Sequence, residues 1–206
     1  METLNADMKE KYTDSLSLRL AGMVSSFTVK ISKKSQKPFG IMLLEDLESS
    51  CELMLYERTL NAVKEAGIEL AAGSEVIMEV TARRNDEGER PRLAVEKLYL
   101  LDQAPEMYTE ELYLHIYEKT MQPDTLKKLL ELCRSRQIQN SGVRLILCLV
   151  NDRETIFVES GLKGLSVDMA MLKKIDKLLG ENNYRIKPKE VAPPPRVWSK
   201  PKPAAE

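Results

Sequence analysis

The feature that most constrains the fold of this chain is the order of its strand-like segments up to residue 103. In these segments apolar residues alternate with polar ones, and turn residues separate them, as expected for half-buried strands. The expected elements are the strands 16–34, 39–44, 51–56, 75–81 and 93–101 and the helix 57–66. Three strands, a helix and two strands is the order of an OB-fold, a five-stranded Greek-key barrel.

Three residues with special backbone properties refine these elements. Gly22 interrupts the first strand and predicts a bulge or a bend there. Pro38 should begin the second strand, because proline is tolerated at the first residue of a strand. Gly67 follows the helix and is a plausible C′ glycine, since this position favours a left-handed backbone.

A second set of elements follows residue 108, in the order β-α-β-β-α-β. Two helices have one apolar face each, and Pro123 stands where a first helical turn tolerates proline. The expected elements are the strands 110–118, 143–150, 154–159 and 183–187 and the helices 124–137 and 168–179. The order predicts a small α/β sandwich, with two helices against one sheet.

The chain is therefore expected to be of the β plus α+β class, in three parts. These are an OB-fold nucleic-acid-binding domain over 16–103, an α+β domain over 108–187 and a disordered Pro- and Lys-rich C-terminal tail over 188–206. The tail holds six of the ten prolines of the chain. Its basic residues and Trp198 could dock on a partner, but a solvated tail is the interpretation we favour.

Composition restricts the function classes. The net charge of -1 and the pI near 6.1 give no global attraction to nucleic acid or to an anionic membrane, so any such binding needs a local patch. No apolar run is long enough to span a bilayer, and the N-terminus lacks a signal-peptide core, which favours a cytoplasmic protein without a membrane partner. Cys51, Cys133 and Cys148 are expected to be buried free thiols.

A local basic patch is present in the loop between the first two strands. Four lysines occur there with no acidic residue among them, and the loop between the last two strands carries four arginines beside Asp86, Glu87 and Glu89. These two loops flank the binding groove of an OB-fold. The candidate nucleic-acid-binding cations are Lys30, Lys33, Lys34, Lys37, Arg83, Arg84, Arg90 and Arg92.

Aromatic side chains could complete such a groove, because rings stack on bases while cations neutralise phosphates. Phe39 and Tyr56 are the candidate platforms, and Phe27 is a weaker one. For Phe39 and Tyr56 we favour positions in the core, since small barrels need large apolar fillers. For the lysines, a solvated hairpin is the alternative to binding.

The sequence shows no pattern that is typical of a catalytic site. The single histidine, His115, lies in an alternating run beside Tyr113 and Tyr117, which predicts a half-exposed strand position. The pair Glu45 and Asp46 precedes a turn, where acidic side chains cap backbone amides. No carboxylate spacing suggests a metal site, and no glycine-rich phosphate loop is present. We expect no active site, no metal and no cofactor.

Five segments together resemble a known family. The segments 20–24 (LAGMV), 40–46 (GIMLLED) and 52–56 (ELMLY), the short helix 60–67 and the closing strand 95–98 (VEKL) are similar to the OB-fold region near the C-terminus of the bacterial DNA polymerase III alpha subunit. The second half is similar to the domain that follows it in that subunit. The resemblance covers about residues 16–187.

The resemblance implies a role in DNA replication. It implies that the lysine loop contacts single-stranded template DNA and that residues 110–187 bind the clamp-loader tau subunit among other replisome proteins. The catalytic aspartates and the N-terminal metal domain of the family have no counterpart here, so this chain should not polymerise DNA alone. It would be a C-terminal fragment of the subunit or a stand-alone derivative.

Two other functions remain open from the sequence. One is a protein-interaction adaptor whose OB-fold no longer binds nucleic acid, which would agree with the near-zero net charge. The other is an independent RNA-binding OB-fold protein, which would leave the second domain unexplained.

Overall fold

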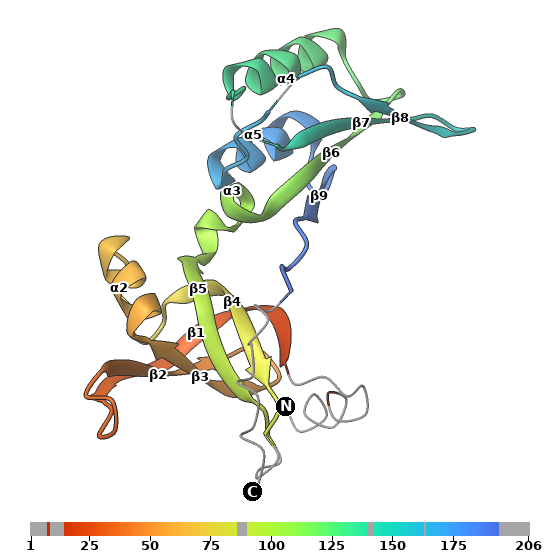
Figure 1. Ribbon diagram of the computed structural model, residues 1–206. Helices are drawn as coiled ribbons and strands as arrows, with labels where there is room; N and C mark the ends of the chain where they lie inside the picture. The colour runs from red at the N-terminus through yellow and green to blue at the C-terminus, as the bar shows by residue number, and fades with distance from the viewer. Residues whose placement is uncertain (1–7, 9–14, 86–89, 140–141, 163, 194–206) are drawn as a thin grey trace, which may run out of the picture. The chain divides into compact units, whose positions relative to one another are not determined.

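The computed structural model describes residues 8, 15–85, 90–139, 142–162 and 164–193. Its backbone contacts separate two compact units: the first contains the described residues up to Tyr99 together with 191–193, and the second spans Leu100–Glu190. Figure 1 shows a strand-rich first unit and a second unit in which helices cover a sheet. The tail expected beyond residue 193 and the acidic residues Asp86, Glu87 and Glu89 lie outside the described residues.

The first unit is a closed five-stranded barrel. Its strands follow one another around the barrel in the order β1-β2-β3-β5-β4, with β3 and β5 parallel. This order, with a helix between the third and fourth strands, is that of an OB-fold. The elements are β1 (Ser15–Ile31), β2 (Pro38–Glu45), β3 (Ser50–Tyr56), α2 (Glu57–Glu65), β4 (Glu75–Arg83) and β5 (Arg92–Leu100). Pro38 begins β2 as expected.

Alternation along the strands decides which side chains fill the barrel. Met42 and Leu44 of β2 and Leu53 and Leu55 of β3 are buried, whereas their neighbours along each strand are partly or fully exposed. Residues opposite one another in an antiparallel pair share a face of the sheet. Met42 pairs with Leu53, so the two strands present one inner apolar row and one outer row.

Gly22 does not form the bulge that the sequence predicted. The register of β1 against β2 shifts between Val24 and Ser26 instead. A Cβ atom on Gly22 would lie 2.6 Å from the carbonyl oxygen of Glu45 on β2. The glycine is therefore needed for a close approach of two strands, which is the other use of glycine in a sheet.

Helix α2 ends in the manner predicted from Gly67. This residue has φ of +67°, its N–H donates to the carbonyl of Lys64, and the N–H of Ile68 donates to that of Val63. These two bonds form a Schellman motif, which satisfies carbonyls at the end of the helix. Inside the barrel unit, the Thr59 hydroxyl of α2 donates to the Val95 carbonyl of β5 at 2.8 Å.

The second unit is a four-stranded sheet covered by two helices. The strand order is β8-β7-β6-β9, with β6 and β7 parallel and the other neighbours antiparallel. The elements follow as β6 (Thr109–Tyr117), α4 (Pro123–Ser135), β7 (Arg144–Val150), β8 (Thr155–Glu159), α5 (Met169–Leu179) and β9 (Tyr184–Pro188). A 3₁₀ turn (Leu101–Gln103) and the short helix α3 (Ala104–Tyr108) precede them and were not expected from the sequence.

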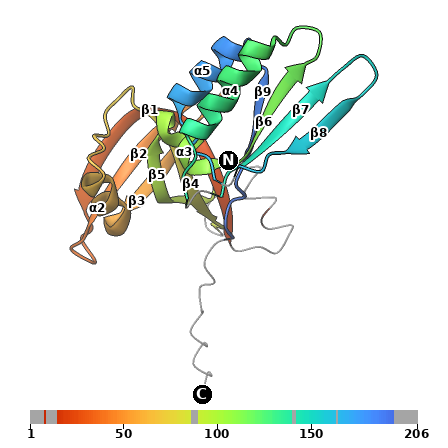
Figure 2. The same cartoon turned by 90° about the horizontal axis from the view of Figure 1, so that it is seen from above.

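Both long helices pack on the same face of this sheet. Leu112, Leu114 and Ile116 of β6 belong to one buried cluster together with Leu129 of α4 and Met171 of α5. Figure 2 shows α4 and α5 side by side over one face, and the opposite face carries no helix among the described elements. Among the described residues, none of the helices combines the length and apolar content that crossing a membrane requires.

Candidate nucleic-acid interface

The lysine loop is a short, ordered connection between β1 and β2. The N–H of Ser32 donates to the Lys37 carbonyl at 2.9 Å, and Gln36 adopts a left-handed backbone with φ of 55°. The turn places Lys33 and Lys34 at its exposed tip. Both side chains lack an ion-pair partner among the described residues, so their charges remain available to a polyanion.

Lys37 differs from the other lysines of the loop because it is already paired. Its ammonium lies 2.8 Å from the carboxylate of Glu57, at the start of α2. The hydrogen bond to Glu57 raises the pKa of Lys37. The ammonium is exposed, so the pair is open to competition from a phosphate.

The strand register aligns one cation and two rings across the outer face of the barrel. Lys30 of β1 is opposite Phe39 of β2, and Phe39 is opposite Tyr56 of β3. Phe39 precedes the buried Gly40 and Tyr56 follows the buried Leu55, so both rings stand on the outer face, and strand pairing places Lys30 on the same face. The outer face of strands 2 and 3 is the surface on which OB-folds bind oligonucleotides.

The two rings border a pocket of about 410 Å³ on this face. Lys37, Met54 and Arg58 also line it. Tyr56 is 53% exposed, so its expected core position is wrong, and Phe39 is half-buried. The reason is that successive side chains of a strand point to opposite faces: Leu55 points inward, so the Tyr56 ring points outward.

Phe27, rather than Phe39 or Tyr56, occupies a position on the inner side of the barrel. Its ring atom Cε2 would lie 2.6 Å from a Cβ on Gly40, on the inner side of β2, and the Leu60 side chain of α2 is close to the same point. The ring therefore fills space above Gly40 and is not a stacking platform on the outer face.

The arginines of the second loop divide into two pairs. Arg90 and Arg92 line a pocket of about 310 Å³ along the edge of β3, and Met54 borders both this pocket and the first one. Arg83 is opposite Ser15 at the end of β4, and Arg84 is half-buried. Neither Arg83 nor Arg84 is among the residues that line these two pockets. The structure thus brings two of the four arginines next to the outer face of β3.

The turn after β2 and the cysteines have structural roles. The carboxylate of Asp46 accepts hydrogen bonds from the N–H groups of Glu48 and Ser49, which lower the pKa of Asp46, as expected for a capping residue. Cys133 and Cys148 are buried free thiols, and burial raises the pKa of Cys133 to about 11. Cys51 is also free but only half-buried, so the expectation of full burial is wrong there.

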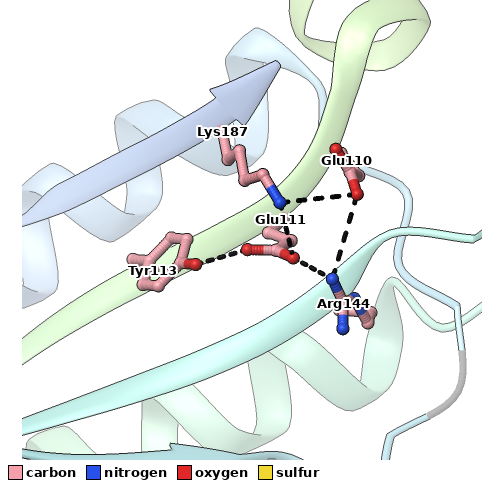
Figure 3. Close-up of polar contacts among 5 residues, drawn as sticks. All are labelled: Glu110, Glu111, Tyr113, Arg144 and Lys187. Carbon is pink, nitrogen blue, oxygen red and sulfur yellow. Dashed lines mark hydrogen bonds and ion pairs between the residues drawn. The ribbon is translucent and has the colours of Figure 1, made fainter. Parts of the chain in front are cut away.

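A second polar cluster lies in the α+β unit and was not singled out in the sequence. The Glu111 carboxylate accepts a hydrogen bond from the Tyr113 hydroxyl and pairs with Arg144 and Lys187, the latter at 3.1 Å (Figure 3). Glu110 lies 3.6 Å from the same Lys187 ammonium. The Tyr113 hydrogen bond lowers the pKa of Glu111, although burial acts against it, and raises that of Tyr113.

This cluster joins three neighbouring strands, since Glu111 is opposite Lys187 on β9 and Arg144 on β7. The side chain of Glu111 is only 5% exposed, and a buried carboxylate needs such partners. Sequence alternation placed Glu111 and Tyr113 on one face, but the partners come from strands far along the chain. Among the described residues, no group of three or more His, Cys, Asp and Glu side chains could hold a metal ion.

Comparison with known proteins gives only structural likenesses. No protein-family model and no curated protein matches the sequence. The chain is similar to the mitochondrial single-stranded DNA-binding protein Rim1 of S. cerevisiae at 19% identity, over 41% of this chain and 94% of that one, with a TM-score of 0.34. It is similar to the SSB domain of a Synechococcus sp. protein at 17% identity, over 42% and 94% of the two chains, with a TM-score of 0.33.

An asparaginyl-tRNA synthetase from Pyrococcus horikoshii shares 16% identity over 58% of this chain and 28% of that one, with a TM-score of 0.33. At such scores the likeness is too weak to carry an argument. The assignment of the first unit to the OB-fold class therefore rests on its own strand order and helix position.

Proposed function

We propose that the barrel binds single-stranded DNA across the outer face of β1, β2 and β3. The observation that carries the proposal is the row Lys30–Phe39–Tyr56, which ends beside the open lysines of the loop. Rings on this row can stack on bases of any sequence, and the lysines can neutralise the phosphates between them. The expected base preference is therefore small.

The spacing of the two rings also suits a single-stranded nucleic acid. Neighbouring strands lie about 4.8 Å apart, so Phe39 and Tyr56 stand at a spacing that admits successive bases of an extended strand. Arg58 also lines the pocket that they border, and a second pocket, which shares Met54 with the first, is lined by Arg90 and Arg92. A strand lying across β2 and β3 would thus pass from the lysine loop toward these arginines.

A finer proposal concerns the cellular role. We propose that the chain is a non-catalytic module of a DNA polymerase III alpha subunit, in which the barrel holds template DNA and residues 110–187 bind the tau subunit of the clamp loader. The support is the sequence resemblance of the two halves and their order. The polymerase active site of that subunit would lie outside these residues, and we propose no enzymatic activity for the chain.

One observation favours a second candidate, a protein-interaction adaptor without DNA binding. Lys37 is neutralised by Glu57, and the net charge of the chain is -1, so the attraction of the loop for a polyanion is smaller than its lysine count suggests. The two candidates differ in one measurable property, the affinity for single-stranded DNA.

Fluorescence anisotropy with a labelled single-stranded oligonucleotide separates them. Lys33→Glu/Lys34→Glu should weaken binding and make the slope of log K against log salt shallower by about 1.4, because each lost phosphate contact removes about 0.7. The matched control is Lys173→Glu/Lys174→Glu, an exposed lysine pair on α5 that changes the net charge equally.

The aromatic part of the row is tested by Tyr56→Ala. Loss of one stacking platform should cost about 1–3 kcal/mol of binding free energy, while the exposed side chain contributes little to the fold. Equal affinities for wild type, Tyr56→Ala and Lys33→Glu/Lys34→Glu would favour the adaptor. A pull-down of the full chain with the cognate tau subunit tests the finer proposal, which fails if the two proteins do not associate.

A further inference from the structure

The helix-free face of the second sheet carries side chains of the same kinds as the barrel groove. Helices α4 and α5 cover the face of Leu112, Leu114 and Ile116. Tyr113 and His115 alternate with these residues along β6 and therefore stand on the open face. Register extends this face across the sheet. His115 is opposite Cys148 of β7, and Cys148 is opposite Phe157 of β8.

Tyr113 has a cation beside it on the same face. It is opposite Arg185 on β9, and Arg185 is exposed, with no ion pair among the described residues. The neighbouring row holds Lys187, whose ammonium is paired with Glu111 (Figure 3). One cation of this face is thus open and the other is held in place by a carboxylate.

These side chains border a common depression. Tyr113, His115, Phe157, Arg185 and Lys187 line a pocket of about 400 Å³, and no acidic residue is among its lining residues. Phe157 is 64% exposed, although most phenylalanine side chains are buried in soluble proteins. Tyr113 on β6 and Phe157 on β8 are separated by β7, and Arg185 stands beside Tyr113 on β9. Two rings on one face of a sheet, with cations beside one of them, form a surface that suits splayed bases and their phosphates.

We propose that this open face of the α+β unit is a second binding surface for single-stranded nucleic acid. Phe157 and Tyr113 would stack on bases, and Arg185 would contact a phosphate beside the base on Tyr113. Glu111 fixes the Tyr113 ring through the hydroxyl and holds Lys187 at the rim. The choice of nucleic acid over another polyanion rests on the proposed function of the barrel, but the residues involved are separate from those of the barrel.

The two rings on this face favour nucleic acid over a peptide as the ligand. An acidic peptide would engage Arg185 but would leave the two rings without planar partners, whereas a single strand uses both. DNA and RNA share the bases and phosphates on which the proposal depends. The affinity for an RNA oligonucleotide of the same sequence is therefore measured beside that for DNA. The tighter of the two identifies which nucleic acid this face binds.

The test uses the full chain and a barrel variant, Lys33→Glu/Lys34→Glu/Tyr56→Ala, in which the first surface is impaired. Phe157→Ala and Arg185→Glu are introduced into both backgrounds and studied by anisotropy. In the barrel variant Phe157→Ala should weaken binding at least about fivefold, the lower limit for loss of one stacked base, and Arg185→Glu should weaken it through loss of a phosphate contact. Arg185→Glu should also make the salt slope shallower by about 0.7.

The two matched controls lie away from the open face, one on β8 and one on α5. Ile156→Ala removes an apolar side chain from β8 that points to the opposite face, where Ile156 borders a pocket with Ile116 and Leu149. Lys173→Glu reverses an exposed charge on α5. Neither should change the affinity. Phe157 and Arg185 are both exposed, so far-ultraviolet circular dichroism should show that their variants fold.

Photo-crosslinking with an iododeoxyuridine oligonucleotide locates the ligand directly. Cross-links to peptides that contain Tyr113 or Phe157, retained in the barrel variant, support the second surface. Wild-type affinity of Phe157→Ala and Arg185→Glu in both backgrounds, with no such cross-link, overturns it. Loss of all binding in the barrel variant also overturns it while leaving the proposed function intact. Binding that depends only on Phe157 and Arg185 retains the second surface and refutes the first.

Discussion

The Lys37–Glu57 pair predicts that a substitution at Glu57 can strengthen the binding of single-stranded DNA. In the free protein the ammonium is 2.8 Å from the carboxylate, so a phosphate must compete with Glu57 for the Lys37 charge. Glu57→Gln removes that competition and leaves the geometry of α2 almost unchanged, because the two side chains have nearly the same shape. We expect the variant to bind single-stranded DNA more tightly than the wild type.

The magnitude follows from counterion release. One additional phosphate contact with a single strand steepens the slope of log K against log salt by about 0.7, which corresponds to about a fivefold gain in affinity at 0.1 M salt. Anisotropy titrations at several salt concentrations measure both quantities. Glu48→Gln, at an exposed turn residue outside the pocket, controls for the change of net charge alone.

A double-mutant cycle identifies the origin of the gain. If Glu57→Gln acts by releasing Lys37, the gain should disappear in Glu57→Gln/Lys37→Ala, since coupled residues deviate from additivity. A slope equal to that of the wild type would refute the reasoning. So would a gain that persists when Lys37 is absent, because the effect would then come from general charge rather than from this pair.

Three further predictions concern stability. Gly22→Ala should destabilise the barrel by about 1–3 kcal/mol in urea unfolding, because its Cβ meets the Glu45 carbonyl oxygen at 2.6 Å, whereas Gly142→Ala, with nothing within 4 Å, should not meet this clash. Burial raises the pKa of Cys133 from 9.0 to about 11, so the stability that the buried thiol contributes is full below pH 9 and falls by about 3 kcal/mol as the pH rises from 9 through 11; a pH series on Cys133→Ala should lack this decline. Asp168→Ala should cost about 1 kcal/mol and speed amide exchange at the start of α5, because the carboxylate caps that helix, and unchanged exchange would contradict it.

Features with a local cause could be predicted from the sequence. The end of α2 at Gly67 and the start of β2 at Pro38 follow from the backbone restrictions of single residues. The half-exposed position of His115 follows from alternation within one strand. In these cases the residues that decide the outcome are neighbours in the chain.

Features that depend on distant strands could not be predicted. The role of Gly22 is set by the carbonyl of Glu45, which is brought close only by strand pairing. The row from Lys30 through Phe39 to Tyr56 needs the register of two hairpins. The outward direction of the Tyr56 ring could have been predicted from the sequence. Side chains alternate between the two faces of a strand, and Tyr56 directly follows the apolar Leu55.

Carboxylates beside both surfaces affect how each would bind. In the barrel Glu57 neutralises Lys37, and on the second sheet Glu111 holds Lys187, so each surface keeps fewer open cations than its composition suggests. In the lysine loop, Lys30, Lys33 and Lys34 remain open, which corresponds to a contribution of about -2.1 to the salt slope of the first surface. This is less steep than the slope of about -2.8 that four open lysines would give. A larger share of the binding free energy must then come from stacking on exposed rings, which depends little on salt.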